Sequence, residues 1–89
     1  MNQITMFKVV SSQISSVGYD RDTKTMYVEF SNGTVYTYDE VPQNVFENMK
    51  NSNSAGRFFM TSIKGYFDYS KTDLEVEKGI INLNIHQRK

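Results

Sequence analysis

The sequence predicts a single α+β domain, in which an antiparallel β-meander of about three strands packs against two short helices and a C-terminal β-hairpin follows. Three observations predict this fold. Two pairs of stretches alternate apolar and polar residues with the period of a β-strand, and a glycine-containing turn joins each pair. Two short stretches between these pairs have apolar residues at helical spacing. A chain of 89 residues has room for one hydrophobic core, so we treat residues 1–89 as one domain.

The strands of the meander are expected in the first half of the chain. Residues 7–19 contain the first strand, and Gly18 interrupts its alternation, which indicates a β-bulge. The clearest pattern comes next, where Asn32-Gly33 joins the alternating residues 25–30 and 34–38. Asn-Gly between two alternating stretches is the strongest short-range signal for a β-hairpin.

Two registers are open for this hairpin. A two-residue loop would pair Phe30 with Val35, and a three-residue loop with a left-handed glycine would pair Glu29 with Val35. Only the second register gathers the larger apolar side chains on one face: Met26, Val28, Phe30, Tyr36 and Tyr38. Because burial selects the register that gathers apolar groups, we favour the three-residue loop. In that register Tyr36 and Tyr38 are mainly core residues whose hydroxyl groups reach the rim.

Two helices are expected after the hairpin. The first covers about residues 42–50 and begins at a proline, which suits the first turn of a helix. Ser54 is a good N-cap for the second helix, which covers about residues 55–64. Gly65 is a suitable stop for it, and Gly56 in its first turn permits close approach of another backbone or of a ligand.

A second hairpin is expected at the C-terminus, where residues 74–77 and 80–85 flank Lys78-Gly79. A two-residue loop pairs Val76 with Ile81 and places five apolar residues on one face: Leu74, Val76, Ile81, Leu83 and Ile85. A lone hairpin is only marginally stable in water, so this face must pack on the domain or on a partner chain. A homo-oligomer formed through this face is therefore possible.

Several stretches occur together in a recognisable order: residues 11–20, Tyr27-Val28-Glu29-Phe30, Gly33, Tyr36-Thr37-Tyr38, Val41-Pro42, residues 54–59 and Ile63-Lys64. In that order they resemble the KTSC domain, over residues 9–69, and the hairpin of residues 70–89 lies outside the resemblance as an extension. The family is named for its occurrence at the C-terminus of some lysyl-tRNA synthetases, and it also occurs as a stand-alone protein in bacteria and phages. The resemblance implies no established role, although the synthetase association suggests RNA binding.

The chain lacks the residues that most catalytic and metal sites need. It has no Cys, and its single His, His86, falls in the expected C-terminal tail. It also has no phosphate loop and no dinucleotide fingerprint. We therefore expect a binding module rather than an enzyme, with no metal or cofactor. Because no stretch has the apolar length of a bilayer span and no signal peptide is recognisable, we expect a cytoplasmic protein.

The expected ligand site lies at the start of the second helix. Ser54, Gly56 and the free N–H groups of the first turn would form a small anion pocket. Arg57 lies beside it, and Lys64, seven residues further on, would share the same helix face. Four aromatic residues would provide a wall on which a base could stack: Tyr36, Tyr38, Phe58 and Tyr66. The alternative is that these aromatic residues belong to the core, that Ser54 only caps and that Arg57 is solvated.

The charge distribution bears on the kind of ligand. The formal net charge is zero, which weighs against a binder of long nucleic acids, but residues 1–49 carry −3 and residues 50–89 carry +3. An anionic ligand would be steered to the second half. We therefore expect a nucleotidic ligand, either a small phosphate-bearing nucleotide or single-stranded RNA. Two alternatives stay open: a phage-type interaction factor that inhibits or sequesters a host defence component, acting as a homo-oligomer, and a structural accessory domain without a ligand.

Overall fold

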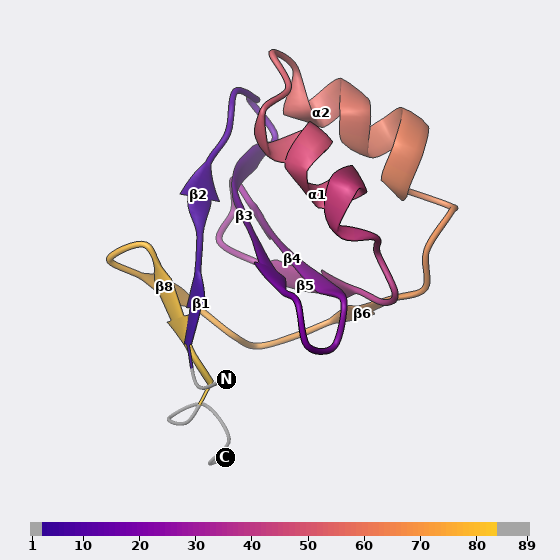
Figure 1. Cartoon of the computed structure of the whole chain (residues 1–89). Coiled ribbons are helices and arrows are strands. Elements are labelled where there is room, and N and C mark those ends of the chain that lie inside the picture. Colours follow the sequence, from indigo (N-terminus) through magenta and orange to yellow (C-terminus); the bar gives the residue numbers. More distant parts are fainter. Residues whose placement is uncertain (1–2, 84–89) are drawn as a thin grey trace.

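The computed structural model describes residues 3–83, which form two antiparallel sheets and two helical segments (Figure 1). The larger sheet has the strand order β2 (Phe7–Lys8), β3 (Ile14–Asp20), β4 (Thr25–Phe30), β5 (Val35–Tyr38), β6 (Tyr69–Lys71). The smaller sheet has the order β1 (Gln3–Thr5), β8 (Ile80–Asn82), β7 (Val76–Glu77). The helical segments are α1 (Gln43–Lys50) and α2 (Ala55–Phe58), which continues into a π-helical turn, η1 (Phe59–Ile63). The predicted α+β class is confirmed, and β1, β2 and β6 are strands beyond the predicted ones.

Two hydrophobic cores lie on the two faces of the larger sheet. The first joins the sheet to the helices and contains Val17, Met26, Val28, Phe46, Met49, Phe59 and Ile63 among others. The second joins it to the smaller sheet and contains Ile4, Met6, Tyr27, Val35 and Ile81. Because side chains alternate along a strand, β4 serves both cores: Met26 enters the first and Tyr27 the second.

The β4–β5 hairpin has the register that burial favours. Glu29 pairs with Val35, and Gly33 in the loop has a φ angle of +92°, which glycine adopts without strain. The predicted three-residue loop is therefore confirmed. As a consequence, Tyr36 and Tyr38 lie on the helix-facing side of the sheet.

The N-terminal part differs from the prediction of one strand. Residues 7–19 form two antiparallel strands, β2 and β3, joined by a turn. The hydroxyl oxygen of Ser11 accepts hydrogen bonds from the N–H groups of Gln13 at 3.0 Å and Ile14 at 3.1 Å. This side-chain bonding offers the backbone an alternative to a continuous strand and explains the turn.

Gly18 has a different role from the predicted bulge, which lies instead between Ile14 and Ser16. A Cβ atom placed on Gly18 would come within 2.5 Å of the Met6 sulfur and 2.7 Å of the Thr5 carbonyl oxygen. Real side chains do not tolerate such distances. Glycine at this position therefore allows β1 to cross closely over β3, and the smaller sheet packs on the larger one.

The first helix follows the prediction and begins directly after Pro42, but the second segment is not one continuous α-helix. The Thr61 hydroxyl donates to the Arg57 carbonyl at 3.0 Å, and that carbonyl is the acceptor which an α-helix would give to the Thr61 N–H. The turn therefore takes in an extra residue, and the Lys64 N–H donates to the Phe59 carbonyl at 2.9 Å.

No helix within residues 3–83 has the length and apolar character needed to cross a membrane.

The C-terminal hairpin is tied into the domain through β1. Ile81 pairs with Ile4 of β1 and with Val76 of β7, and its side chain is completely buried. Three more residues of the hairpin face are half-buried on the same core: Leu74, Val76 and Leu83. Ile85 lies outside the described residues. The chain itself thus covers most of the face that we had considered for a partner copy.

Candidate functional site

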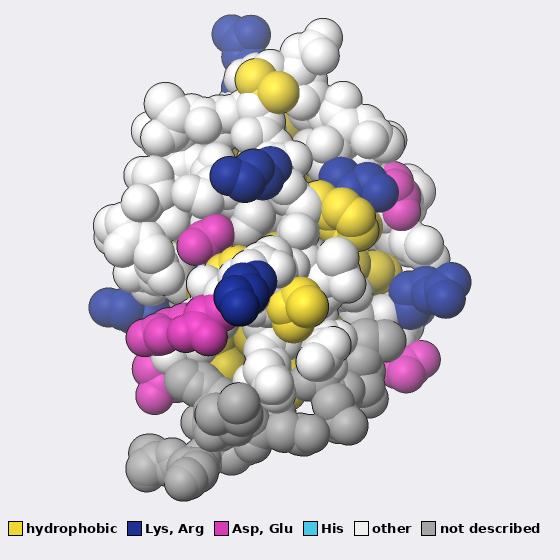
Figure 2. All heavy atoms as spheres, turned by 90° about the vertical axis from the view of Figure 1, so that its left-hand side faces the viewer, with side chains coloured by type: hydrophobic (Ala, Val, Ile, Leu, Met, Phe, Trp, Pro, Cys, Tyr) yellow, Lys and Arg dark blue, Asp and Glu magenta, His cyan; other side chains and the backbone are white. Residues whose placement is uncertain are grey.

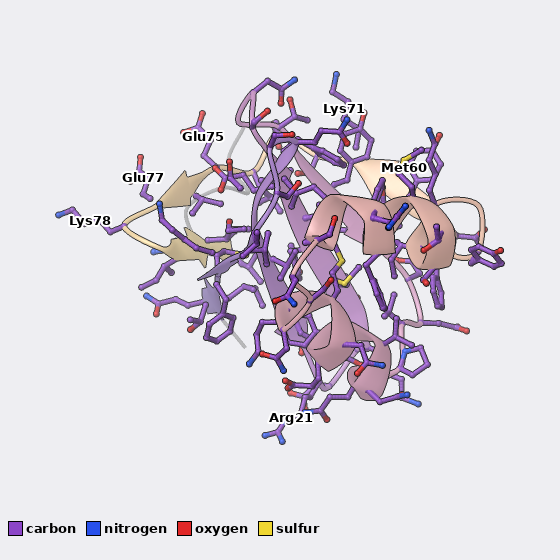
Figure 3. All side chains as sticks on the ribbon, turned by 90° about the horizontal axis from the view of Figure 1, so that it is seen from above. Arg21, Met60, Lys71, Glu75, Glu77 and Lys78 are labelled. Atoms are coloured by element: carbon purple, nitrogen blue, oxygen red, sulfur yellow. The ribbon has the colours of Figure 1, made fainter. Side chains whose placement is uncertain are left out.

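A groove opens between the β6 edge of the larger sheet and the π-helical turn η1. Its volume is about 700 Å³, which is typical of sites for small ligands. Five of its lining residues are aromatic: Phe30, Tyr36, Tyr38, Phe59 and Tyr69. The others are Gln13, Ser31, Asn32, Thr34, Met60, Lys64, Gly65 and Lys71. Figure 3 labels Met60 on η1 and Lys71 on β6, which lie on the same side of the molecule and border this aromatic groove.

The pairing of β5 with β6 creates the aromatic wall. The ring centroid of Tyr69 lies 5.9 Å from those of both Tyr36 and Tyr38. The Phe59 ring meets Tyr38 edge-on at 5.6 Å and Phe30 edge-on at 5.5 Å. Such ring pairs are favourable beyond the area they bury. The wall is therefore held in place by its own contacts before any ligand arrives.

The five rings differ in how far water reaches them. Tyr38 and Phe59 are buried, with 4% and 6% of their surface exposed. Tyr36 is half-buried, whereas Tyr69 is 64% exposed. The ring surface available to a ligand therefore comes mainly from Tyr36 and Tyr69, and the buried rings support them. Our expectation that Tyr38 is a core residue is confirmed, and Tyr36 is partly displayed.

The charges that line the aromatic groove are all positive. Lys71 lies opposite Tyr36 in the β5–β6 ladder, and Lys64 follows η1 directly. Both lysines are exposed, and within residues 3–83 neither forms an ion pair. No carboxylate of the described chain lines the groove, although the whole sequence has equal numbers of acidic and basic residues. The groove is therefore a locally basic region on a chain with no formal net charge.

Polar groups of the groove can also donate hydrogen bonds. The Thr34 N–H donates to the Asn32 side-chain oxygen at 3.0 Å, which leaves the amide nitrogen of Asn32 to donate to a ligand. Burial raises the pKa of Tyr38 to about 12, and the neighbouring hydroxyls of Tyr36 and Tyr69 make smaller contributions in the same direction. The Tyr38 phenol is therefore protonated at neutral pH, where it can donate a hydrogen bond.

The structure brings half of the predicted site residues to this region. Three of them line the aromatic groove: Tyr36, Tyr38 and Lys64. A fourth, Tyr66, is 69% exposed and lines an adjoining hollow together with Tyr69. The remaining four line neither: Ser54, Gly56, Arg57 and Phe58. They belong to the N-terminal end of the helical segment, away from the groove.

The start of α2 is occupied by the N-terminal part of the same chain. The Ala55 N–H donates to the Val10 carbonyl at 2.9 Å. A Cβ atom on Gly56 would lie 2.9 Å from the Ser11 hydroxyl oxygen, and the Ser54 side chain makes no capping hydrogen bond. The close approach and one of the N–H groups that we had expected a ligand to use are therefore used within the fold.

The prediction that Arg57 and Lys64 share a helix face is corrected by the π-helical turn. Its extra residue rotates everything after it by roughly 100° relative to a continuous α-helix. Lys64 lines the aromatic groove, while Arg57 is exposed and outside its lining. Phe58 is half-buried against the helix-facing core.

The two groove residues on β6, Tyr69 and Lys71, are among those that sequence reasoning missed. The only local signal is the alternation of Tyr69-Ser70-Lys71, and three residues are too few to indicate a strand. The strand forms because these residues pair with β5, which lies far earlier in the sequence. Long-range pairing of this kind leaves little trace in local composition.

The groove lies within the part of the chain that matches a known domain family. The model of the KTSC domain family matches residues 10–77, and every residue that lines the groove lies in that range. A crystal structure of a KTSC domain protein from Yersinia pestis is similar with a TM-score of 0.73 and 36% sequence identity. That match covers 78% of this chain and 97% of the other.

Longer proteins contain a similar segment. The lysine–tRNA ligase of Nostoc punctiforme is 36% identical over 66 residues, and that of Trichormus variabilis is 38% identical over 66 residues. Each match covers 74% of this chain but 12% of the ligase. The chain therefore spans a small part of the ligases that it matches.

Proposed function

This chain belongs to the KTSC domain family, and we propose that it is a non-enzymatic binding module whose aromatic groove takes a nucleotidic ligand, either a small phosphate-bearing nucleotide or single-stranded RNA. The observation that carries the proposal is the make-up of the groove, where accessible tyrosine rings lie beside two lysines and, within residues 3–83, no carboxylate. A nucleotide contains an aromatic base and a phosphate. In the groove the tyrosine rings suit the base and the lysines suit the phosphate.

The base would stack on the rings of Tyr36 and Tyr69. A base stacked on an aromatic side chain typically contributes about 1–3 kcal/mol, and it does so with little dependence on which base is present. The rings are held by Tyr38, Phe30 and Phe59 through the contacts described above. Little side-chain freedom is then lost on binding, which favours affinity.

The phosphate would lie near Lys64 and Lys71. Two cations suit a ligand with one or two phosphates, whereas a long strand relies on many more contacts. Figure 2 shows the side of the molecule that lies at the left of Figure 1, where basic and acidic side chains of the described residues are mixed. A short ligand therefore fits this chain better than a long nucleic acid.

We propose recognition without turnover. The groove offers phenol, amide, hydroxyl and ammonium groups, but no Asp, Glu, His or Cys of the described chain. These are the side chains that usually act as general bases or nucleophiles. With its pKa raised to about 12, Tyr38 is a poor general base at neutral pH. Residues 3–83 also contain no group of three or more His, Cys, Asp or Glu side chains that could hold a metal ion.

The relatives support a nucleic-acid context. A segment similar to this chain occurs in lysine–tRNA ligases, whose name includes an RNA. That association is consistent with a groove for nucleotides and does not depend on the ligase reaction. Nucleotides and RNA are abundant in the cytoplasm, where we propose that the protein acts.

Calorimetric titration with AMP tests the proposal. We expect AMP to bind the wild-type protein and to raise its melting temperature, since a ligand that binds only the folded state stabilises it. A double variant with Lys64→Gln and Lys71→Gln should bind about tenfold more weakly, because the phosphate loses both cations.

The matched control is a double variant with Arg57→Gln and Lys78→Gln. It removes the same charge from two exposed positions outside the groove, so AMP affinity should be unchanged. Equal weakening in both double variants would show that net charge, and not the groove, governs binding. A wild-type protein that binds neither AMP nor short RNA would contradict the proposed function itself.

A further inference from the structure

A second hollow adjoins the aromatic groove. Its volume is about 440 Å³, and residues 65–69 line it; we call it the Tyr66 hollow. Gly65 and Tyr69 line both the groove and this hollow, so the two are neighbours. Tyr66 and Tyr69 are 69% and 64% exposed. Each of the two neighbouring hollows is therefore bordered by an accessible ring.

Exposed large apolar side chains are concentrated at this surface. Of the five in the described chain, three border the groove or the hollow: Met60, Tyr66 and Tyr69. The other two, Phe7 and Val10, lie on β2 and in the loop that follows it. A concentration of exposed apolar groups on a monomer is typical of a site that a ligand covers.

The turn that carries Tyr66 is fixed at both ends. The Tyr66 N–H donates to the Ile63 carbonyl at 3.0 Å, and the Asp39 N–H donates to the Asp68 carbonyl at 2.9 Å. Gly65, with a φ angle of +86°, makes the sharp change of direction after η1. A ring on a fixed turn needs little ordering when it binds.

The charges differ between the two parts of this surface. Lys64 lines the groove and is the residue before Gly65, where the groove meets the Tyr66 hollow. Asp68 lines the hollow. A phosphate is favoured beside Lys64 and disfavoured beside Asp68. The hollow therefore suits an uncharged base, and the junction suits a phosphate.

We infer, on the basis of the proposed function, that the ligand is a single-stranded oligonucleotide rather than a mononucleotide. One base stacks on Tyr36 and Tyr69 in the groove, the linking phosphate lies beside Lys64, and the next base stacks on Tyr66. Accessible rings border both hollows, and Lys64 lines the groove next to Gly65, which both hollows share. This arrangement matches the order of base, phosphate and base along a strand, and aromatic platforms with cations are a general means of binding single strands.

Calorimetry with AMP and with the RNA dinucleotide ApA tests this inference. Each probe has one phosphorus atom, and the diester of ApA carries less negative charge than the monoester of AMP, so tighter binding of ApA than of AMP reports on the second nucleoside. The wild-type protein should bind ApA about tenfold more tightly than AMP, as expected for one further stacked base. Tyr66→Ala should reduce ApA affinity to that of AMP and leave AMP affinity unchanged. Tyr66→Phe keeps the ring and should retain tight ApA binding.

Three outcomes would overturn the inference. ApA could bind the wild-type protein no more tightly than AMP, Tyr66→Ala could weaken AMP as much as ApA, or Tyr66→Phe could bind ApA as weakly as Tyr66→Ala. In each of these cases, an observed binding of AMP to the groove would still support the proposed function. If the wild-type protein binds neither probe, both fail. Because Tyr66 is exposed, circular dichroism should show a native fold for both variants.

Discussion

Tyr69 lies directly opposite Tyr38 across the β5–β6 ladder, with ring centroids 5.9 Å apart, yet Tyr38 is 4% exposed and Tyr69 is 64% exposed. The buried ring belongs to the core beneath the helices, and the exposed ring extends that core to the surface. We therefore expect stability to depend mainly on Tyr38 and ligand binding to depend mainly on its neighbour Tyr69. Substitutions at the two positions should separate these properties.

We expect Tyr69→Ala to weaken AMP binding about tenfold while changing the free energy of unfolding by less than about 1 kcal/mol, because its ring is mostly exposed. Tyr38→Ala should instead lower the free energy of unfolding by about 3–5 kcal/mol, since it removes a buried ring. Calorimetry and urea unfolding measure the two effects. The separation fails if Tyr69→Ala costs as much stability as Tyr38→Ala.

Stability should fall at alkaline pH. The folded state raises the pKa of Tyr38 from 10.0 to about 12, so between these values the unfolded chain loses this proton more readily and ionisation favours unfolding. Below that window both states keep the proton and Tyr38 contributes no pH dependence. Burial, with a smaller effect of Asp20, also raises the pKa values of Tyr19 and Tyr27, which adds to the loss.

The Tyr38→Phe variant isolates the part that Tyr38 contributes. Urea unfolding from about pH 9 to about pH 12 should show a shallower loss of stability in this variant than in the wild-type protein. Identical pH dependence in the two proteins would mean that the Tyr38 hydroxyl titrates in the same way in the folded and unfolded states.

Gly18→Ala tests the packing of the smaller sheet on the larger one. The new Cβ would approach the Met6 sulfur to 2.5 Å and the Thr5 carbonyl oxygen to 2.7 Å, so we expect a loss of about 1–3 kcal/mol of stability. Gly56→Ala is the control: its only close neighbour is the Ser11 hydroxyl at 2.9 Å, which the N–H groups of Gln13 and Ile14 hold. The cost of this contact is offset because alanine is the better helix former by about 1 kcal/mol. We expect it to be nearly neutral by urea unfolding, and a reversed order of the two variants would contradict the packing described.

Local patterns predict the parts of the fold whose partners are close in sequence. Asn32-Gly33 and the flanking alternation are enough for the β4–β5 hairpin, and the burial of Tyr36 and Tyr38 selects its register. The same reasoning gives the Val76–Ile81 pair of the C-terminal hairpin. In each case one short turn fixes which residues face each other.

The remaining elements depend on contacts that local patterns do not contain. Tyr69–Lys71 becomes a strand only because it meets β5, and Gly18 is required only because β1 crosses it. The π-helical turn, in which the Thr61 hydroxyl bonds to the Arg57 carbonyl, lies between Arg57 and Lys64. For these reasons the sequence places the expected site at the start of the second helix, whereas the groove lies at its end.

The most direct test of the groove is to add AMP to isotope-labelled protein and follow its backbone amide signals by NMR. We expect the largest changes at Asn32, Tyr36, Tyr69 and Lys71, which line the aromatic groove, and little change at residues 54–58. Changes centred on residues 54–58 or on the hairpin of residues 74–83, with the groove signals unmoved, would contradict it.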